Sequence, residues 1–173
     1  QSRHNQVDSI NSGGAIRNLG TPTITSSTFD DNSAGNGGAL YPRFSASRTA
    51  ITNSLFIHNS TLNTTNGWGG AMLIWDGAPV TVQGSQFISN TARWGGAIYV
   101  YPASQLTVTA SSLTNNVADG GPSADGGGGA LYSNARVALG DTTLTANVVI
   151  VPPGFAAVGV RALVWGAVPP TQP

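Results

Sequence analysis

The residues of this chain best suited to acid–base chemistry are two adjacent aspartates, Asp30 and Asp31. A glycosidase needs two carboxylates held across the bond that it cleaves, and a calcium-dependent lyase needs clustered carboxylates with a cationic base. The other aspartates are scattered along the chain, and the sequence contains no lysine. We therefore expect no catalytic site, and a polysaccharide lyase or hydrolase is the least favoured interpretation.

Other residue types that often carry chemistry are equally sparse. The chain has no cysteine, so it has no thiolate metal site, and its two histidines, His4 and His58, do not make a metal site by themselves. The glycine run at residues 126–129 lacks the lysine of a phosphate-binding loop and is expected to be a turn. We expect neither a metal ion nor a cofactor.

The elements that would position any functional residue are set by an internal repeat. A Gly-Gly-Ala-aliphatic motif occurs five times, beginning at Gly13, Gly37, Gly69, Gly95 and Gly128. Each copy is followed by an apolar residue three positions before an asparagine, in the pairs Phe29/Asn32, Phe56/Asn59, Phe87/Asn90, Leu113/Asn116 and Leu144/Asn147. Five positions before each Phe or Leu is an aliphatic residue: Ile24, Ile51, Val82, Val108 and Leu139. Constant spacing within each unit and variable lengths between them are typical of stacked coils.

This pattern predicts an all-β, right-handed parallel β-helix, or β-solenoid, of about five coils. Coils stacked roughly 4.8 Å apart pair every strand with the strands above and below, so equivalent residues form columns. The aliphatic and Phe/Leu columns are expected inside. The asparagine column is expected to be an internal ladder with a structural role, formed by Asn32, Asn59, Asn90, Asn116 and Asn147. Arg3-His4-Asn5 corresponds to Ile57-His58-Asn59, which indicates a truncated first coil.

The pairing of Gly-Gly-Ala-Ile with Phe-x-x-Asn resembles the repeats of the chlamydial polymorphic outer membrane proteins. Related repeats occur in surface proteins with the pectin-lyase-like β-helix fold. The resemblance covers residues 11–147, and it implies surface display and adhesion. It does not extend to an autotransporter barrel, which these residues do not contain.

Two sets of side chains are candidates for surface binding. Residues flanking the aliphatic column face outward, and two coils carry complete Thr-x-Thr pairs there: Thr23 and Thr25, and Thr107 and Thr109. Stacked Thr pairs resemble the water-ordering face of solenoidal ice-binding proteins, although Thr is also simply a good exposed strand residue. Tyr41, Tyr99 and Tyr132 share the position after the Gly-Gly-Ala-aliphatic motif, where stacked rings would either bind sugars or cover a flank of the solenoid.

The low charge of the chain excludes two classes of binding partner from our expectations. Charged residues make up 8% of the chain and the net charge is zero, so neither nucleic acid nor an anionic membrane is an expected partner. Two N-glycosylation sequons begin at Asn59 and Asn63, in a polar stretch that is expected to be a surface loop. We expect an extracellular or cell-surface location and glycans as a possible partner.

The repeat ends at Asn147, so residues 1–147 are expected to form the solenoid and residues 148–173 an apolar, Pro-rich segment. The apolar run is too short to span a membrane and contains Arg161. Val158, Val160, Ala162 and Val164 alternate with Gly159, Arg161, Leu163 and Trp165, which favours a strand that either caps the last coil or adds to a neighbouring subunit. The candidate assembly residues in this strand are Val158, Val160, Leu163 and Trp165. The sequence thus predicts a non-enzymatic structural or adhesive solenoid that assembles head to tail into a filament, with a carbohydrate- or ice-binding module as the alternative.

Overall fold

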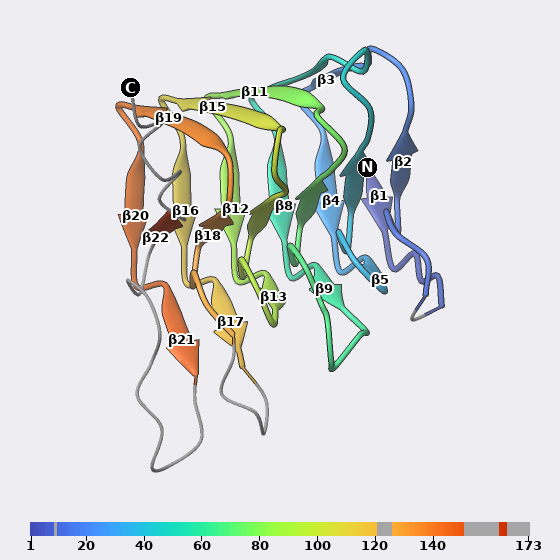
Figure 1. Ribbon diagram of the computed structural model, residues 1–173, viewed down its shortest axis with the longest axis vertical. Helices are drawn as coiled ribbons and strands as arrows, with labels where there is room; N and C mark the ends of the chain where they lie inside the picture. Colours follow the sequence, from blue (N-terminus) through green and yellow to red (C-terminus); the bar gives the residue numbers. More distant parts are fainter. Residues whose placement is uncertain (9, 121–125, 151–162, 166–173) are drawn as a thin grey trace, which may run out of the picture.

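The protein is a stack of coils made of short β-strands, as the computed structural model shows for residues 1–8, 10–120, 126–150 and 163–165 (Figure 1). Four parallel sheets run along the stack, and each complete coil contributes one strand to each of them. The described residues form no helix that could cross a membrane. The predicted all-β solenoid of about five coils is therefore confirmed.

We number the sheets in the order in which a coil visits them. Sheet 1 follows the glycine pairs and contains β2 (Ile16–Asn18), β6 (Leu40–Pro42), β10 (Met72–Ile74), β14 (Ile98–Val100), β18 (Leu131–Ser133) and β22 (Leu163–Trp165). Sheet 2 carries the aliphatic column and contains β3 (Thr23–Thr25), β7 (Thr49–Thr52), β11 (Pro79–Gln83), β15 (Gln105–Thr109) and β19 (Arg136–Gly140).

The other two sheets flank the asparagine column. Sheet 3 contains β1 (Ser2–Arg3), β4 (Thr28–Asp30), β8 (Leu55–Ile57), β12 (Gln86–Ile88), β16 (Ser112–Thr114) and β20 (Thr143–Thr145). Sheet 4 contains β5 (Ser33–Ala34), β9 (Ser60–Thr61), β13 (Thr91–Ala92), β17 (Val117–Asp119) and β21 (Val148–Ile150). Strand β1 precedes the first complete coil and pairs with β4, so Arg3 lies beside Asp30.

The strand register places the repeated residues in columns. Ile24 lies beside Ile51, and Phe29 beside Phe56, each pair coming from consecutive coils. The rings of Phe29, Phe56 and Phe87 stack in parallel inside the solenoid, with centroid separations of 4.6 and 4.7 Å. Ring burial of this kind removes large apolar areas from water and holds consecutive coils together.

The glycine pairs are required by the close approach of neighbouring coils. The first glycine of a pair adopts a positive φ, which is 54° at Gly37 and which most side chains disfavour. The second glycine lies against the next coil, where a Cβ atom on Gly38 would overlap the carbonyl oxygen of Gly70. Neither position accepts a larger residue without backbone movement, which explains why the motif recurs once per coil.

Each coil continues past its asparagine. The residues after each asparagine form sheet 4. Because β21 pairs with β17, residues 148–150 extend sheet 4 in the fifth coil. The backbone of β22 pairs with β18 and so extends sheet 1 of the same chain.

Candidate functional site

The asparagines form one continuous ladder of six rungs, because Asn5 adds a rung below the five that the repeat contains. Each side-chain amide nitrogen below Asn147 donates to the Oδ1 atom of the next rung, at 2.8–3.0 Å. From Asn32 onward, the same nitrogen also donates to a main-chain carbonyl of the preceding coil. Asn32, Asn59, Asn90 and Asn116 are fully buried. These four interior rungs thus satisfy their own polar groups and have no atoms available for chemistry.

Aromatic side chains are divided between the interior of the solenoid and the outside of sheet 1. The three stacked phenylalanines of sheet 3 lie in the interior, whereas every tyrosine and tryptophan whose side chain is described lies on the outside of sheet 1. We call this surface the outer aromatic face, formed by Tyr41, Trp68, Trp75, Trp94, Tyr99, Tyr101 and Tyr132 around Leu73.

The outer aromatic face has a covered layer and a partly exposed layer. Tyr41 and Tyr99, which were candidates either for binding sugars or for covering a flank, are only 8% and 6% exposed. The Trp68 ring lies 5.7 Å from that of Tyr99, and the Arg17 guanidinium lies 5.9 Å from the centroid of Tyr41. Tyr132 is partly exposed and stacks on Tyr99 at 5.2 Å. The surface available to a partner is therefore made by Trp68, Trp75, Trp94, Tyr101 and Tyr132.

Burial changes the acidity of the covered tyrosines. Desolvation raises the pKa of Tyr99 to about 12, and the Tyr132 ring beside it adds to the increase, while a hydrogen bond from Asn134 opposes it. Desolvation also raises the pKa of Tyr41, against the opposing charges of Arg43 and Arg17. Both phenols are therefore neutral at physiological pH, and the outer aromatic face carries no charge of its own.

The exposed layer was only partly recognisable from the sequence. Trp68 and Trp94 directly precede glycine pairs, and a β-bridge places them side by side in consecutive coils. Trp75 and Tyr101 follow β10 and β14, and their rings stack at a centroid separation of 3.5 Å. Sequence alone could not show that these two pairs converge over Leu73, because that contact joins separate columns and coils.

The threonine candidates lie on the outside of sheet 2. Thr23, Thr25 and Thr107 are exposed, while Thr109 is half-buried. The register places Ala50 beside Thr23 and Gln83 beside Thr109, so the two Thr-x-Thr pairs occupy the first and fourth coils without a continuous hydroxyl array between them.

The aspartate pair lies on the outside of sheet 3 beside cationic or protonatable neighbours. Arg3 Nε is 3.6 Å from an Asp30 oxygen, and His58 Nδ1 lies 3.6 Å from the other. His4 Nε2 is 3.2 Å from Asp31. These are exposed surface contacts, which contribute little to stability. In the described part of the chain, no three or more His, Asp or Glu side chains converge in a way that could hold a metal ion.

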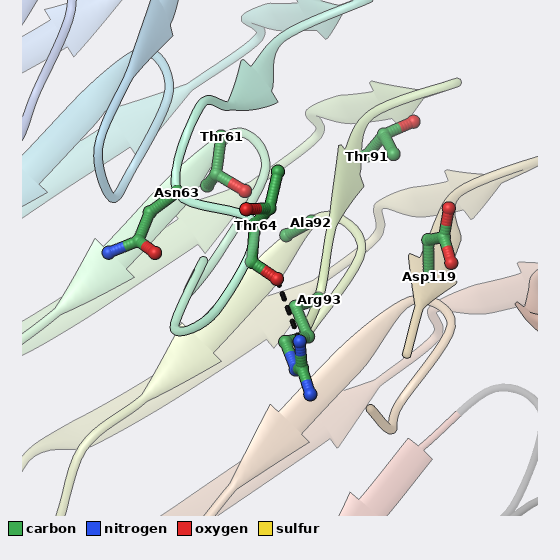
Figure 2. A pocket seen from close by; sticks show the side chains of 7 residues that line it. All are labelled: Thr61, Asn63, Thr64, Thr91, Ala92, Arg93 and Asp119. Atoms are coloured by element: carbon green, nitrogen blue, oxygen red, sulfur yellow. Dashed lines mark hydrogen bonds between the residues drawn. The ribbon is translucent and has the colours of Figure 1, made fainter. Parts of the chain in front are cut away.

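A pocket of about 240 Å³ lies beside the loop that follows β9 (Figure 2). Its lining residues are Thr61, Asn63, Thr64, Thr91, Ala92, Arg93 and Asp119. Arg93 is 6% exposed, and its Nη1 donates to the carbonyl oxygen of Thr64 at 2.7 Å, which connects the loop after β9 to the coil that carries Arg93. The lining contains one carboxylate, so it lacks the carboxylate pair that glycoside hydrolysis needs.

The two sequon asparagines occupy different environments. Asn59 is a buried rung of the ladder and not a loop residue, so the expectation of a glycan at Asn59 conflicts with the folded structure. Asn63 is partly exposed in the loop after β9. Of the residues expected to mediate assembly, Val158 and Val160 lie outside the described residues, and Leu163 and Trp165 bound strand β22.

Comparison with known proteins identifies one family. The family model described as "Right handed beta helix region" matches residues 1–162. No significant match was found among curated proteins or among solved structures. The matched region includes all five complete coils, in agreement with the parallel register of the four sheets.

Proposed function

Since this chain belongs to the right-handed β-helix family, we propose that it is a non-enzymatic, extracellular adhesive scaffold whose outer aromatic face binds uncharged glycan chains. The resemblance of its paired motifs to polymorphic outer membrane protein repeats supports display at a cell surface. The observation that carries the proposal is that tyrosines and tryptophans gather on the outside of sheet 1, while the stacked phenylalanines of sheet 3 lie in the core.

A solenoid does not need tryptophan and tyrosine on one outer face in order to fold. Inside, Phe, Leu, Ile and Val fill the core without polar atoms. Trp and Tyr differ from Phe in carrying a polar group, which suits rings that contact a partially hydrated ligand. Sugar rings combine apolar C–H faces with hydroxyl groups, so they match both properties of the outer aromatic face.

Charge supports an uncharged partner. Asp76, which directly follows Trp75, has a carboxylate oxygen 3.3 Å from Nε of Arg43, so that the two charges offset each other. Arg17 lies over the Tyr41 ring at the first-coil end of the face, 5.9 Å from its centroid. The partly exposed rings of the third and fourth coils carry no charge. A ligand that stacks on them therefore needs no charged group in order to bind.

Two features support a non-enzymatic role. The asparagine ladder uses its amide groups to hold the coils, and the Asp30 and Asp31 carboxylates are paired with Arg3, His4 and His58 on an exposed surface. The pocket of Figure 2 has one acidic side chain among its lining residues.

A glycan array probed with labelled protein tests the adhesive role. We expect binding to at least one neutral glycan, and a loss of about tenfold or more in affinity when Trp75 and Tyr101 are both replaced by alanine, because two stacking surfaces are removed. Thr107→Ala on sheet 2 is the matched control and should bind as the unmodified protein does. Equal binding by the double variant would exclude the outer aromatic face as the site.

Head-to-tail assembly is the second part of the proposed function, and exposed apolar side chains of the last complete coil support it. Leu139 and Ile150 are exposed at 37% and 50%. A second copy stacked in register would cover these side chains.

Negative-stain microscopy across a range of concentrations tests this assembly. We expect filaments that shorten or disappear in Ile150→Asp, because this change places a charge where a second copy would cover an apolar side chain. Monodisperse single particles at every concentration would rule out head-to-tail stacking of this chain.

A further inference from the structure

Two sequons that look equivalent in the sequence differ completely in the fold. Asn59-Ser60-Thr61 and Asn63-Thr64-Thr65 lie on either side of the end of β9. A glycan acceptor must be exposed, usually in a loop, since the modifying enzyme and the oligosaccharide both need access to the amide nitrogen. In an unfolded chain, both asparagines meet this requirement.

The Asn59 side chain has no capacity for a glycan once the coil forms. Its Nδ2 atom donates one hydrogen to the carbonyl oxygen of Phe29 and the other to Oδ1 of Asn90, both at 3.0 Å. Its own Oδ1 accepts from the main-chain and side-chain nitrogens of Asn32. The residue is 0% exposed. N-glycosylation replaces one of the two hydrogens with a sugar carbon, so a ladder bond is lost and a ring would have to fit where no space exists.

Asn63 has the opposite arrangement. Its Oδ1 accepts from the main-chain nitrogens of Thr65 and Asn66 and from the Thr65 hydroxyl, at 2.9–3.0 Å. No described residue accepts a hydrogen bond from its Nδ2, which points away from the other labelled side chains in Figure 2. A sugar on Nδ2 leaves all three bonds to Oδ1 intact. This short turn therefore presents the nitrogen to solvent in a form that persists after modification.

We propose that Asn63 is the N-glycan attachment site of this protein, and that a glycan on Asn59 and a folded solenoid exclude each other. In the reaction, Nδ2 of Asn63 forms a bond to the anomeric carbon of a lipid-linked glycosyl diphosphate. The bond from that carbon to the diphosphate oxygen breaks, and one Nδ2 hydrogen leaves as a proton. This assignment does not depend on the outer aromatic face having an adhesive role.

Secretion from a glycosylating eukaryotic cell line, followed by peptide mapping with mass spectrometry, tests both halves of the proposal. We expect the secreted, folded protein to carry a glycan on Asn63 and an unmodified Asn59. Thr65→Val removes the second sequon and should abolish the glycan. In Asn63→Gln, the secreted protein should carry none, because the vacant sequon at Asn59 is closed by the fold.

Thr61→Val is the matched variant, since it removes the first sequon while leaving the Asn59 side chain and the ladder in place. We expect the same glycan on Asn63 and a secreted yield at least equal to that of the unmodified chain. Any molecules modified at Asn59 should occur only in the retained, misfolded fraction. A secreted protein with a native circular dichroism spectrum and a glycan on Asn59, or one that lacks a glycan on Asn63, would overturn the assignment.

Discussion

Replacing Asn90 with leucine removes one central rung of the asparagine ladder while keeping the number and branching of the side-chain heavy atoms. Asn90 is 0% exposed, and its Oδ1 accepts from both the main-chain and the side-chain nitrogen of Asn59. After the substitution, these two N–H groups have no acceptor and remain buried. Each unsatisfied buried donor costs about 1–3 kcal/mol, so we expect a loss of about 2–6 kcal/mol in the free energy of unfolding.

A loss of this size is a large fraction of the roughly 5–15 kcal/mol that holds an ordinary domain together. Urea denaturation followed by circular dichroism measures it through the shift in midpoint. Gln86→Ala is the control, since Gln86 is exposed on β12 of the same coil and should change stability by no more than about 0.5 kcal/mol. If Asn90→Leu unfolds at the same urea concentration as the control, the ladder is not a source of stability and the reasoning fails.

Three further perturbations test other parts of the fold. Because burial raises the pKa of Tyr99 to about 12, above the usual value of 10, its neutral form is favoured in the folded state. The contribution, at most about 2–3 kcal/mol, should be complete below pH 10 and lost between pH 10 and 12. Titration followed by ultraviolet absorbance should show one phenol that ionises only near pH 12. Ionisation of all four tyrosines near the usual pKa of 10 would contradict the burial of Tyr99. Gly38→Ala should prevent folding because the new Cβ overlaps Gly70, whereas Gly140→Ala, whose nearest neighbour would be 3.5 Å away, should fold normally; circular dichroism distinguishes the two. Phe56→Ala should cost about 3–5 kcal/mol in denaturant titrations, since its ring is fully buried between two others, and a cost below about 1 kcal/mol would refute the stacked core.

The columns of the solenoid were predictable because each one is set by residue type at constant spacing. Ile24 and Phe29 lie beside the residues that the repeat aligns with them, and Gly38 meets the steric demand that the glycine pair indicates. Sheet 4 was not predictable in the same way. Its strands are only two or three residues long, and their residue types differ between coils, as in Ser33–Ala34 and Val148–Ile150. No residue type therefore identifies them in the sequence.

The burial of a side chain on the outer side of a sheet cannot be predicted from its own column of equivalent residues alone. Tyr99 faces outward, as the repeat indicates, but Trp68 from another column and coil lies over it. The sequon at Asn59 shows a related difficulty, because a three-residue motif carries no information about the neighbouring coils. The asparagine column predicted burial, the tripeptide predicted exposure, and the hydrogen bonds to Phe29 and Asn90 follow the column.

The most direct test of the adhesive role is a tryptophan fluorescence titration of the purified protein with the neutral oligosaccharides that bind it on the glycan array. Trp68, Trp75 and Trp94 lie in the outer aromatic face, so a bound sugar should change their emission. The account predicts a saturable change that is lost in the Trp75→Ala/Tyr101→Ala double variant and retained in Thr107→Ala. Emission that stays constant with every neutral oligosaccharide, or a change that survives in the double variant, would contradict it.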